Sequence, residues 1–159
     1  MLKRAAILSA AVFAGAGLAT SASAQTFSPS PVSSFTMTGT LAVGHSQAGS
    51  TTCSVTMTGD IPSGGATGAI TGVIFAPGDW RCGWLLVGAG LPWSITPTST
   101  SSASVSLALG ASYACSGVAY ATWVNGAPST ITFPGPVVGS SPACTISGTL
   151  SVSGGLTIL

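Results

Sequence analysis

Charged side chains are almost missing from this sequence. Asp, Glu, Lys and Arg make up 3% of its 159 residues, and it contains one His. Binding to nucleic acid or to an anionic lipid surface requires a cluster of basic side chains, so both partners are excluded. Soluble domains usually keep their copies apart with a charged surface. We therefore expect a Ser/Thr/Gly/Ala surface that associates with copies of itself or with cell-surface or matrix components, the alternative being a neutral monomer.

Groups able to do acid–base chemistry are equally scarce. A serine-hydrolase triad needs a base and an orienting acid, for which only His45 and the pair Asp60 and Asp79 are available, and no Gly-x-Ser-x-Gly motif is present. Glycoside hydrolysis needs two carboxylates, and this pair falls at turns. We expect His45 in a solvated turn, Asp60 at the end of a strand and Asp79 paired with Arg81. The sequence thus predicts no enzyme and no cofactor.

The first 24 residues have the features of a secretory signal peptide. Lys3 and Arg4 precede an apolar run at 5–18, and small residues fill 20–24. The run is too short and too rich in Ala and Gly to span a bilayer, so we expect cleavage after Ala24 and no integral membrane protein afterwards. Cleavage leaves 135 residues, one domain, with one Arg and two Asp and hence a side-chain charge of −1. The predicted location is secreted, extracellular or on the cell surface.

Apolar and polar residues alternate along most of the remaining chain. In the stretch 35–43, Phe, Met, Gly, Leu and Val take the odd positions, and Thr or Ala the even ones. This period of two is typical of half-buried strands, and no amphipathic helical pattern accompanies it. Further strands are expected at 53–58, 69–75, 84–87, 93–96, 103–109, 114–123, 130–133 and 146–153, the last continued by 156–158.

These strands, separated by turn signals, predict an all-β fold. We expect an antiparallel β-sandwich or an open barrel of about eight to ten strands, stabilised by two disulfides. The single β domain is expected over residues 35–159. Residues 25–34 include Pro29 and Pro31 and are expected to form an N-terminal arm, either flexible or exchanged with a neighbouring chain.

Four cysteines carry the most specific pattern in the sequence. Cys53 and Cys82 are 29 residues apart, and so are Cys115 and Cys144. Four cysteines in an exported chain usually form two disulfides, with three pairings formally possible. Both stretches begin with Cys-Ser, pass a glycine turn and return through a strand that ends in Phe. We predict two similar hairpins bridged by Cys53–Cys82 and Cys115–Cys144; no metal site is expected, since zinc sites use closely spaced cysteine pairs.

Aromatic residues are the best candidates for contact with a ligand or partner. Trp80, Trp93 and Trp123 are the candidate contact residues, because exposed indoles stack on sugars or anchor in apolar partners. Trp80 and Trp84 flank a cysteine and Trp93 follows closely, so we expect at least two of these three in the core and Trp80 at the surface. Trp123 and Tyr120 lie on opposite faces of one strand, so one of them should be buried.

Five short motifs, in order along the chain, resemble the secreted PraB-like proteins, named for a protein activator of alkane oxidation. They are SFTMTG at 34–39, CSVTMTG at 53–59, AITG at 69–72, LPW at 91–93 and CTISGTL at 144–150. The resemblance implies a surface accessory protein linked to growth on hydrophobic substrates and to biofilm or adhesion. It implies no catalytic residues.

Three hypotheses on function follow. The first is a secreted, non-enzymatic, surface-associated protein that associates with itself, in adhesion, in biofilm matrix or in growth on alkanes. The second is a soluble extracellular module that binds a hydrophobic or carbohydrate ligand. The third is a pilin-like subunit joined by strand exchange through the N-terminal arm.

Overall fold

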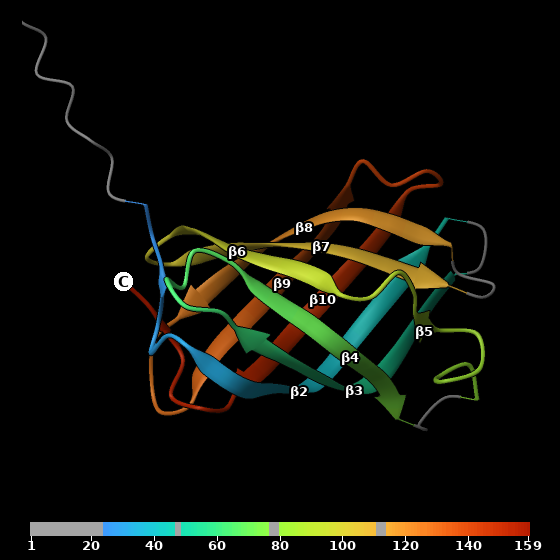
Figure 1. The fold of residues 1–159 in the computed structure, drawn as a ribbon. Coiled ribbons are helices and arrows are strands. Elements are labelled where there is room, and N and C mark those ends of the chain that lie inside the picture. The colour runs from blue at the N-terminus through green and yellow to red at the C-terminus, as the bar shows by residue number, and fades with distance from the viewer. Residues whose placement is uncertain (1–23, 47–48, 77–79, 111–113) are drawn as a thin grey trace, which may run out of the picture.

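Every regular element in the described part of the chain is a β-strand. The computed structural model describes residues 24–46, 49–76, 80–110 and 114–159 (Figure 1). The strands are β1 (Phe27–Ser28), β2 (Val32–His45), β3 (Gly49–Ile61), β4 (Gly68–Ala76), β5 (Val87–Gly88), β6 (Trp93–Ser99), β7 (Ser102–Gly110), β8 (Cys115–Val124), β9 (Ser129–Val138), β10 (Cys144–Val152) and β11 (Thr157–Ile158). The all-β prediction is confirmed. The strand expected at 84–87 is largely a turn, with β5 beginning only at Val87.

Eight of these strands follow one another around an antiparallel barrel. The order is β2, β3, β4, β6, β7, β8, β9 and β10, and β10 pairs back with β2 (Figure 1). The sequence left a sandwich and an open barrel as alternatives; the β7–β8 and β10–β2 pairings make the barrel a closed one. Closure removes the long unpaired edges that an open sheet presents to other chains.

The barrel interior is filled by the apolar residues of the alternating pattern. The core includes Met37, Leu41, Val55, Ile70, Ile95, Val105, Ile131, Phe133 and Leu150, each at most 2% exposed. On the β2–β10 pair, Gly39 lies opposite Leu150 and Gly148 opposite Leu41. A Cβ at either glycine would meet the backbone of the partner strand and the facing leucine. Glycine is therefore required where a large neighbour fills the interior.

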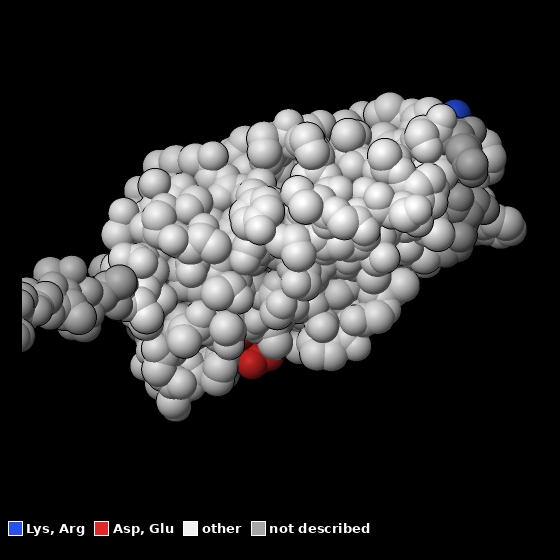
Figure 2. All heavy atoms as spheres, turned by 90° about the horizontal axis from the view of Figure 1, so that it is seen from above, with Lys and Arg blue, Asp and Glu red and all other residues white. Residues whose placement is uncertain are grey.

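The outer wall is covered by neutral polar side chains. Outward positions on β2, β3 and β10 are mostly Thr and Ser, and the Thr132 and Thr149 hydroxyls of β9 and β10 hydrogen-bond at 2.9 Å. In the described residues the charged side chains are Asp60 and Arg81. Figure 2 accordingly shows one face of the molecule almost without charge. No helix in the described part of the chain is long and apolar enough to cross a membrane.

The N-terminal segment closes one end of the barrel, which we call the terminal end. β1 pairs with β11, and Phe27, 1% exposed, packs against Trp123 with ring centroids 5.6 Å apart. The expected arm at 25–34 is docked on its own barrel in this structure. Its first half pairs with the chain's own C-terminus, and β2 already begins at Val32. The segment is held there because the Phe27 side chain is buried in the barrel.

The opposite end of the barrel carries both disulfides, and we call it the disulfide end. Cys53–Cys82 and Cys115–Cys144 have Cα separations of 5.8 and 6.1 Å, which confirms the predicted pairing. Each bridge ties the chain that follows a hairpin, β3–β4 or β8–β9, back to the hairpin's first strand; Cys82 lies in a loop, and Cys144 begins β10. In the barrel order the two hairpins lie on opposite sides. The two predicted hairpins are thus opposite parts of one closed barrel.

Candidate functional site

The most exposed aromatic side chains occur in the segment 80–86, which we call the aromatic loop. Trp80 is 72% exposed and Trp84 is 81% exposed. The loop forms a tight turn, in which the N–H groups of Leu85 and Leu86 donate to the Arg81 carbonyl at 2.9 and 3.0 Å. Leu86 is fully buried and anchors the turn in the core. The result is a fixed apolar projection on a neutral molecule.

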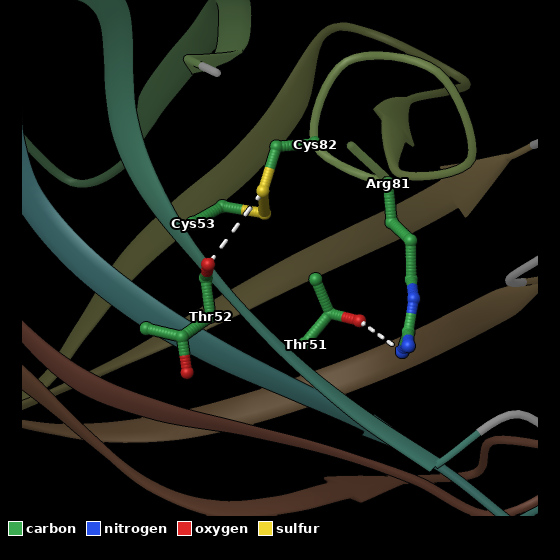
Figure 3. Close-up of a disulfide and its surroundings, with 5 residues drawn as sticks. All are labelled: Thr51, Thr52, Cys53, Arg81 and Cys82. Atoms are coloured by element: carbon green, nitrogen blue, oxygen red, sulfur yellow. Dashed lines mark hydrogen bonds between the residues drawn. A yellow bond between two sulfur atoms is a disulfide. The ribbon is translucent and has the colours of Figure 1, made fainter. Parts of the chain in front are cut away.

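The Cys53–Cys82 bridge fastens the aromatic loop to β3 (Figure 3). The Cys82 sulfur lies 3.6 Å from the Thr52 carbonyl oxygen. An oxidised sulfur has no proton to donate, so this is a packing contact. Bridging a loop of this length stabilises the fold by about 3 to 4 kcal/mol in the chain-entropy picture.

Arg81 points back from the aromatic loop toward the barrel. Its Nη1 donates to the buried Thr51 hydroxyl at 3.0 Å (Figure 3), and its guanidinium carbon lies 5.7 Å from the Trp80 ring centroid. A cation within about 6 Å of an indole face is attracted to it. Arg81 thus steadies Trp80 and the start of the loop. The predicted partner, Asp79, lies outside the described residues.

A groove opens in the barrel wall at the start of β6, and we call it the wall groove. It measures about 410 Å³ and is lined mainly by Pro92, Trp93, Ser94, Ser106, Leu107 and Ala108. It exists because β7 changes partner here: its pairing with β6 extends only to Val105, and its pairing with β5 begins at Leu109. Between these points the segment 90–92 leaves the sheet. The buried Trp93 forms the floor, with its indole N–H donating to the Ala89 carbonyl at 2.7 Å.

Comparison with known proteins gives one match. The sequence model of the family described as alkane oxidation protein activator PraA/PraB-like matches residues 1–159. The chain belongs to this family. The resemblance stated from the five motifs is thereby confirmed. No curated protein and no solved structure matches the chain.

The four tryptophans of this PraA/PraB-like chain divide evenly between core and surface. Trp93 is 3% exposed and Trp123 is 1% exposed, so neither presents its indole on the outer wall for the predicted contact. Trp80 is at the surface as expected, and its contact role stays a prediction. Trp84 was expected in the core, with at least two of the three indoles near Cys82 buried; this was wrong, because the tight turn directs Leu86 inward instead. Trp123 and Tyr120 lie on opposite faces as predicted.

The polar candidates of the PraA/PraB-like chain are separated from one another. His45 ends β2 and is 8% exposed, so the expected solvated turn is wrong; Gly44, Ala143 and Cys144 lie around the same hollow. Asp60 lies one residue before the end of β3, as expected. Among the described residues, no group of three or more His, Cys, Asp or Glu side chains is placed to hold a metal. The family is described as an activator, which is not an enzyme name.

Proposed function

We propose that this chain is a secreted, non-enzymatic accessory protein that acts outside the cell or on its surface, and that it associates with itself. Its setting is adhesion, biofilm matrix or growth on hydrophobic substrates such as alkanes, the last supported by the family description. The observation that carries the proposal is the neutral Thr/Ser wall combined with a fixed aromatic projection. Such a surface has little charge repulsion to keep copies apart.

Export is supported by the N-terminal sequence and by the disulfides. Stable disulfides belong to oxidising compartments outside the cytoplasm. Cleavage after Ala24 would leave two residues before Phe27, whose side chain closes the terminal end. We expect intact-mass analysis of the secreted protein to give Gln25 as its first residue. Protein that keeps residues 1–24 in the medium would contradict export by cleavage.

The second candidate is a soluble module that binds a hydrophobic or carbohydrate ligand. The exposed indoles of Trp80 and Trp84 favour it, because exposed indole rings can stack on sugars or contact apolar groups. Strand exchange between pilin-like subunits has less support. Here β1 already pairs with the chain's own β11, and Phe27 fills the chain's own barrel.

Electron microscopy combined with fractionation of the native host tests the proposal. Filaments or a coat, with the protein in the cell-surface or matrix fraction, are the expected result. Protein that is only soluble and monomeric in the medium, at high concentration, would contradict self-association. A change in tryptophan fluorescence on adding n-hexadecane or a polysaccharide to that monomer would favour the second candidate.

A further inference from the structure

Asn125 is the one asparagine in the sequence, and a glycine follows it. The pair lies at the terminal end, in the turn between β8 and β9. We propose that Asn125 is a latent deamidation site, which the docking of β11 keeps closed and which opening of the terminal end converts irreversibly to aspartate or isoaspartate. This site is independent of the self-association proposed above.

Deamidation of an Asn-Gly pair needs only the chain and water. The Gly126 backbone nitrogen bonds to the side-chain carbonyl carbon, Cγ, of Asn125, and its proton leaves with the amide nitrogen as ammonia. Water then opens the five-membered succinimide at either carbonyl, which gives aspartate or isoaspartate. Glycine favours the attack because it has no Cβ and its backbone turns freely. Asn125 is exposed, so water reaches the site.

Three hydrogen bonds hold the Asn125 amide in the folded chain. Its Oδ1 accepts from the Trp123 indole N–H and from the Ile158 N–H, and its Nδ2 donates to the Ile158 carbonyl, each at 2.9 Å. Two of the three bonds therefore depend on β11. The attack has to bring Cγ within covalent distance of the Gly126 nitrogen and make it tetrahedral, which disrupts this planar arrangement.

The attacking nitrogen is held as well. The Gly126 N–H donates to the Ser129 hydroxyl at 3.1 Å, and that hydroxyl donates to the Gly126 carbonyl at 3.2 Å. Ser129 is 0% exposed and begins β9. Because the nitrogen has to leave the Ser129 oxygen and lose its proton before it can attack, the folded turn slows the reaction at both reacting groups.

The β11 strand is the weak part of this arrangement. It has two residues and pairs with the two residues of β1. One side-chain bond adds to this pairing, from the Thr157 hydroxyl to the Ser28 carbonyl at 3.1 Å. Short elements with few hydrogen bonds open locally at a lower free energy than the long strands of a core. Each opening of β11 frees the Asn125 amide for the attack.

The product does not restore the closed state. A carboxylate only accepts hydrogen bonds, so it cannot donate to the Ile158 carbonyl, and it places a negative charge beside that oxygen. Isoaspartate also lengthens the backbone of the turn by one carbon. In the chain expected after cleavage, the side-chain charge changes from −1 to −2. Deamidation thus makes the loosening of the terminal end a one-way change.

Isoelectric focusing and intact-mass analysis of the secreted protein during incubation at neutral pH measure the reaction, and peptide mapping locates it. We expect the wild type unfolded in guanidinium chloride to deamidate at Asn125 more than about tenfold faster than the folded wild type. Gly126→Ala hinders the attack and, in the same denaturant, should deamidate much more slowly than the wild type. Equal rates for folded and unfolded wild type, or for wild type and Gly126→Ala in denaturant, would overturn the proposal.

Two variants test whether the terminal end controls the rate. Phe27→Ala and Thr157→Val weaken the docking of β1 and β11 and leave Asn125 and Gly126 unchanged. Without denaturant, we expect Phe27→Ala to deamidate at least about tenfold faster than the wild type, and Thr157→Val about two- to tenfold faster.

Ser30→Ala, an exposed change nearby, is the matched control and should deamidate at the wild-type rate. Circular dichroism shows whether each variant is folded, and Thr157→Val carries the comparison where Phe27→Ala is unfolded. Folded variants that deamidate no faster than Ser30→Ala would overturn control by the terminal end.

Discussion

Asn125 joins Trp123 of β8 to Ile158 of β11 at the terminal end through one amide group. Its Oδ1 accepts from the Trp123 indole N–H and from the Ile158 N–H, both at 2.9 Å, and its Nδ2 donates to the Ile158 carbonyl at 2.9 Å. The Trp123 indole is 1% exposed, and Asn125 is the hydrogen-bond partner of its N–H. Leaving a buried donor unsatisfied costs about 1 to 3 kcal/mol.

We expect Asn125→Ala to lower the free energy of unfolding by about 1 to 3 kcal/mol, measured by urea denaturation. Asn125→Asp keeps the acceptor and loses the donor, so its effect should be smaller. Ser151→Ala, at an exposed position of β10, is the control. Equal stability of Asn125→Ala and the control would contradict this role.

The sequence predicted the burial of some single residues correctly and of others wrongly. The alternation around Trp123 and Tyr120 separates them correctly because strand geometry places odd and even positions on opposite faces. Trp84 was misplaced because its closeness to Cys82 suggested packing against the bridge, whereas a turn directs Leu86 inward. His45 was misplaced because a Gly/Ser-rich neighbourhood predicts a loop, although β2 continues to this residue. Turn direction depends on backbone contacts that residue types alone do not specify.

The β1–β11 pair closes the terminal end and gives the N-terminal segment a stabilising role. Phe27 is 1% exposed, and its N–H donates to the Gly65 carbonyl at 2.8 Å. We expect Phe27→Ala to destabilise the protein by about 3 to 5 kcal/mol in thermal or urea unfolding. Ser30→Ala changes an exposed residue nearby and should have little effect. A Phe27→Ala protein as stable as this control would mean that the segment is not docked in solution.

The two disulfides have different tasks at the disulfide end. Cys53→Ala/Cys82→Ala and Cys115→Ala/Cys144→Ala should each lower stability by about 3 to 4 kcal/mol, because the bridged loops are equally long. Only the first should release the aromatic loop, so limited proteolysis should cut near Trp80–Leu86 in that variant alone. Cleavage there in both double variants, or in neither, would contradict the tether.

The closed barrel is the largest feature that the sequence left open. Alternation within a strand identifies which residues face the interior. It does not identify the neighbouring strand with which that strand pairs. Closure depends on β10 returning to β2, two strands about one hundred residues apart in the chain. The hairpin pairs were predictable because their partners are neighbours in sequence and their cysteines are equally spaced. The wall groove was not, because it arises from the change of partner along β7.

Near-neutrality of the whole molecule leads to a prediction about salt. Raising the ionic strength from about 0.01 M to 0.15 M shortens the screening length from about 30 Å to about 8 Å and weakens contacts between exposed charges. A mature chain with one Arg and two Asp has almost no such contacts to lose. We therefore expect the association constant from sedimentation to change by less than about twofold over this range. A salt-dependent loss of association of tenfold or more would mean that the few charges hold the copies together, which would contradict association through neutral and apolar surfaces.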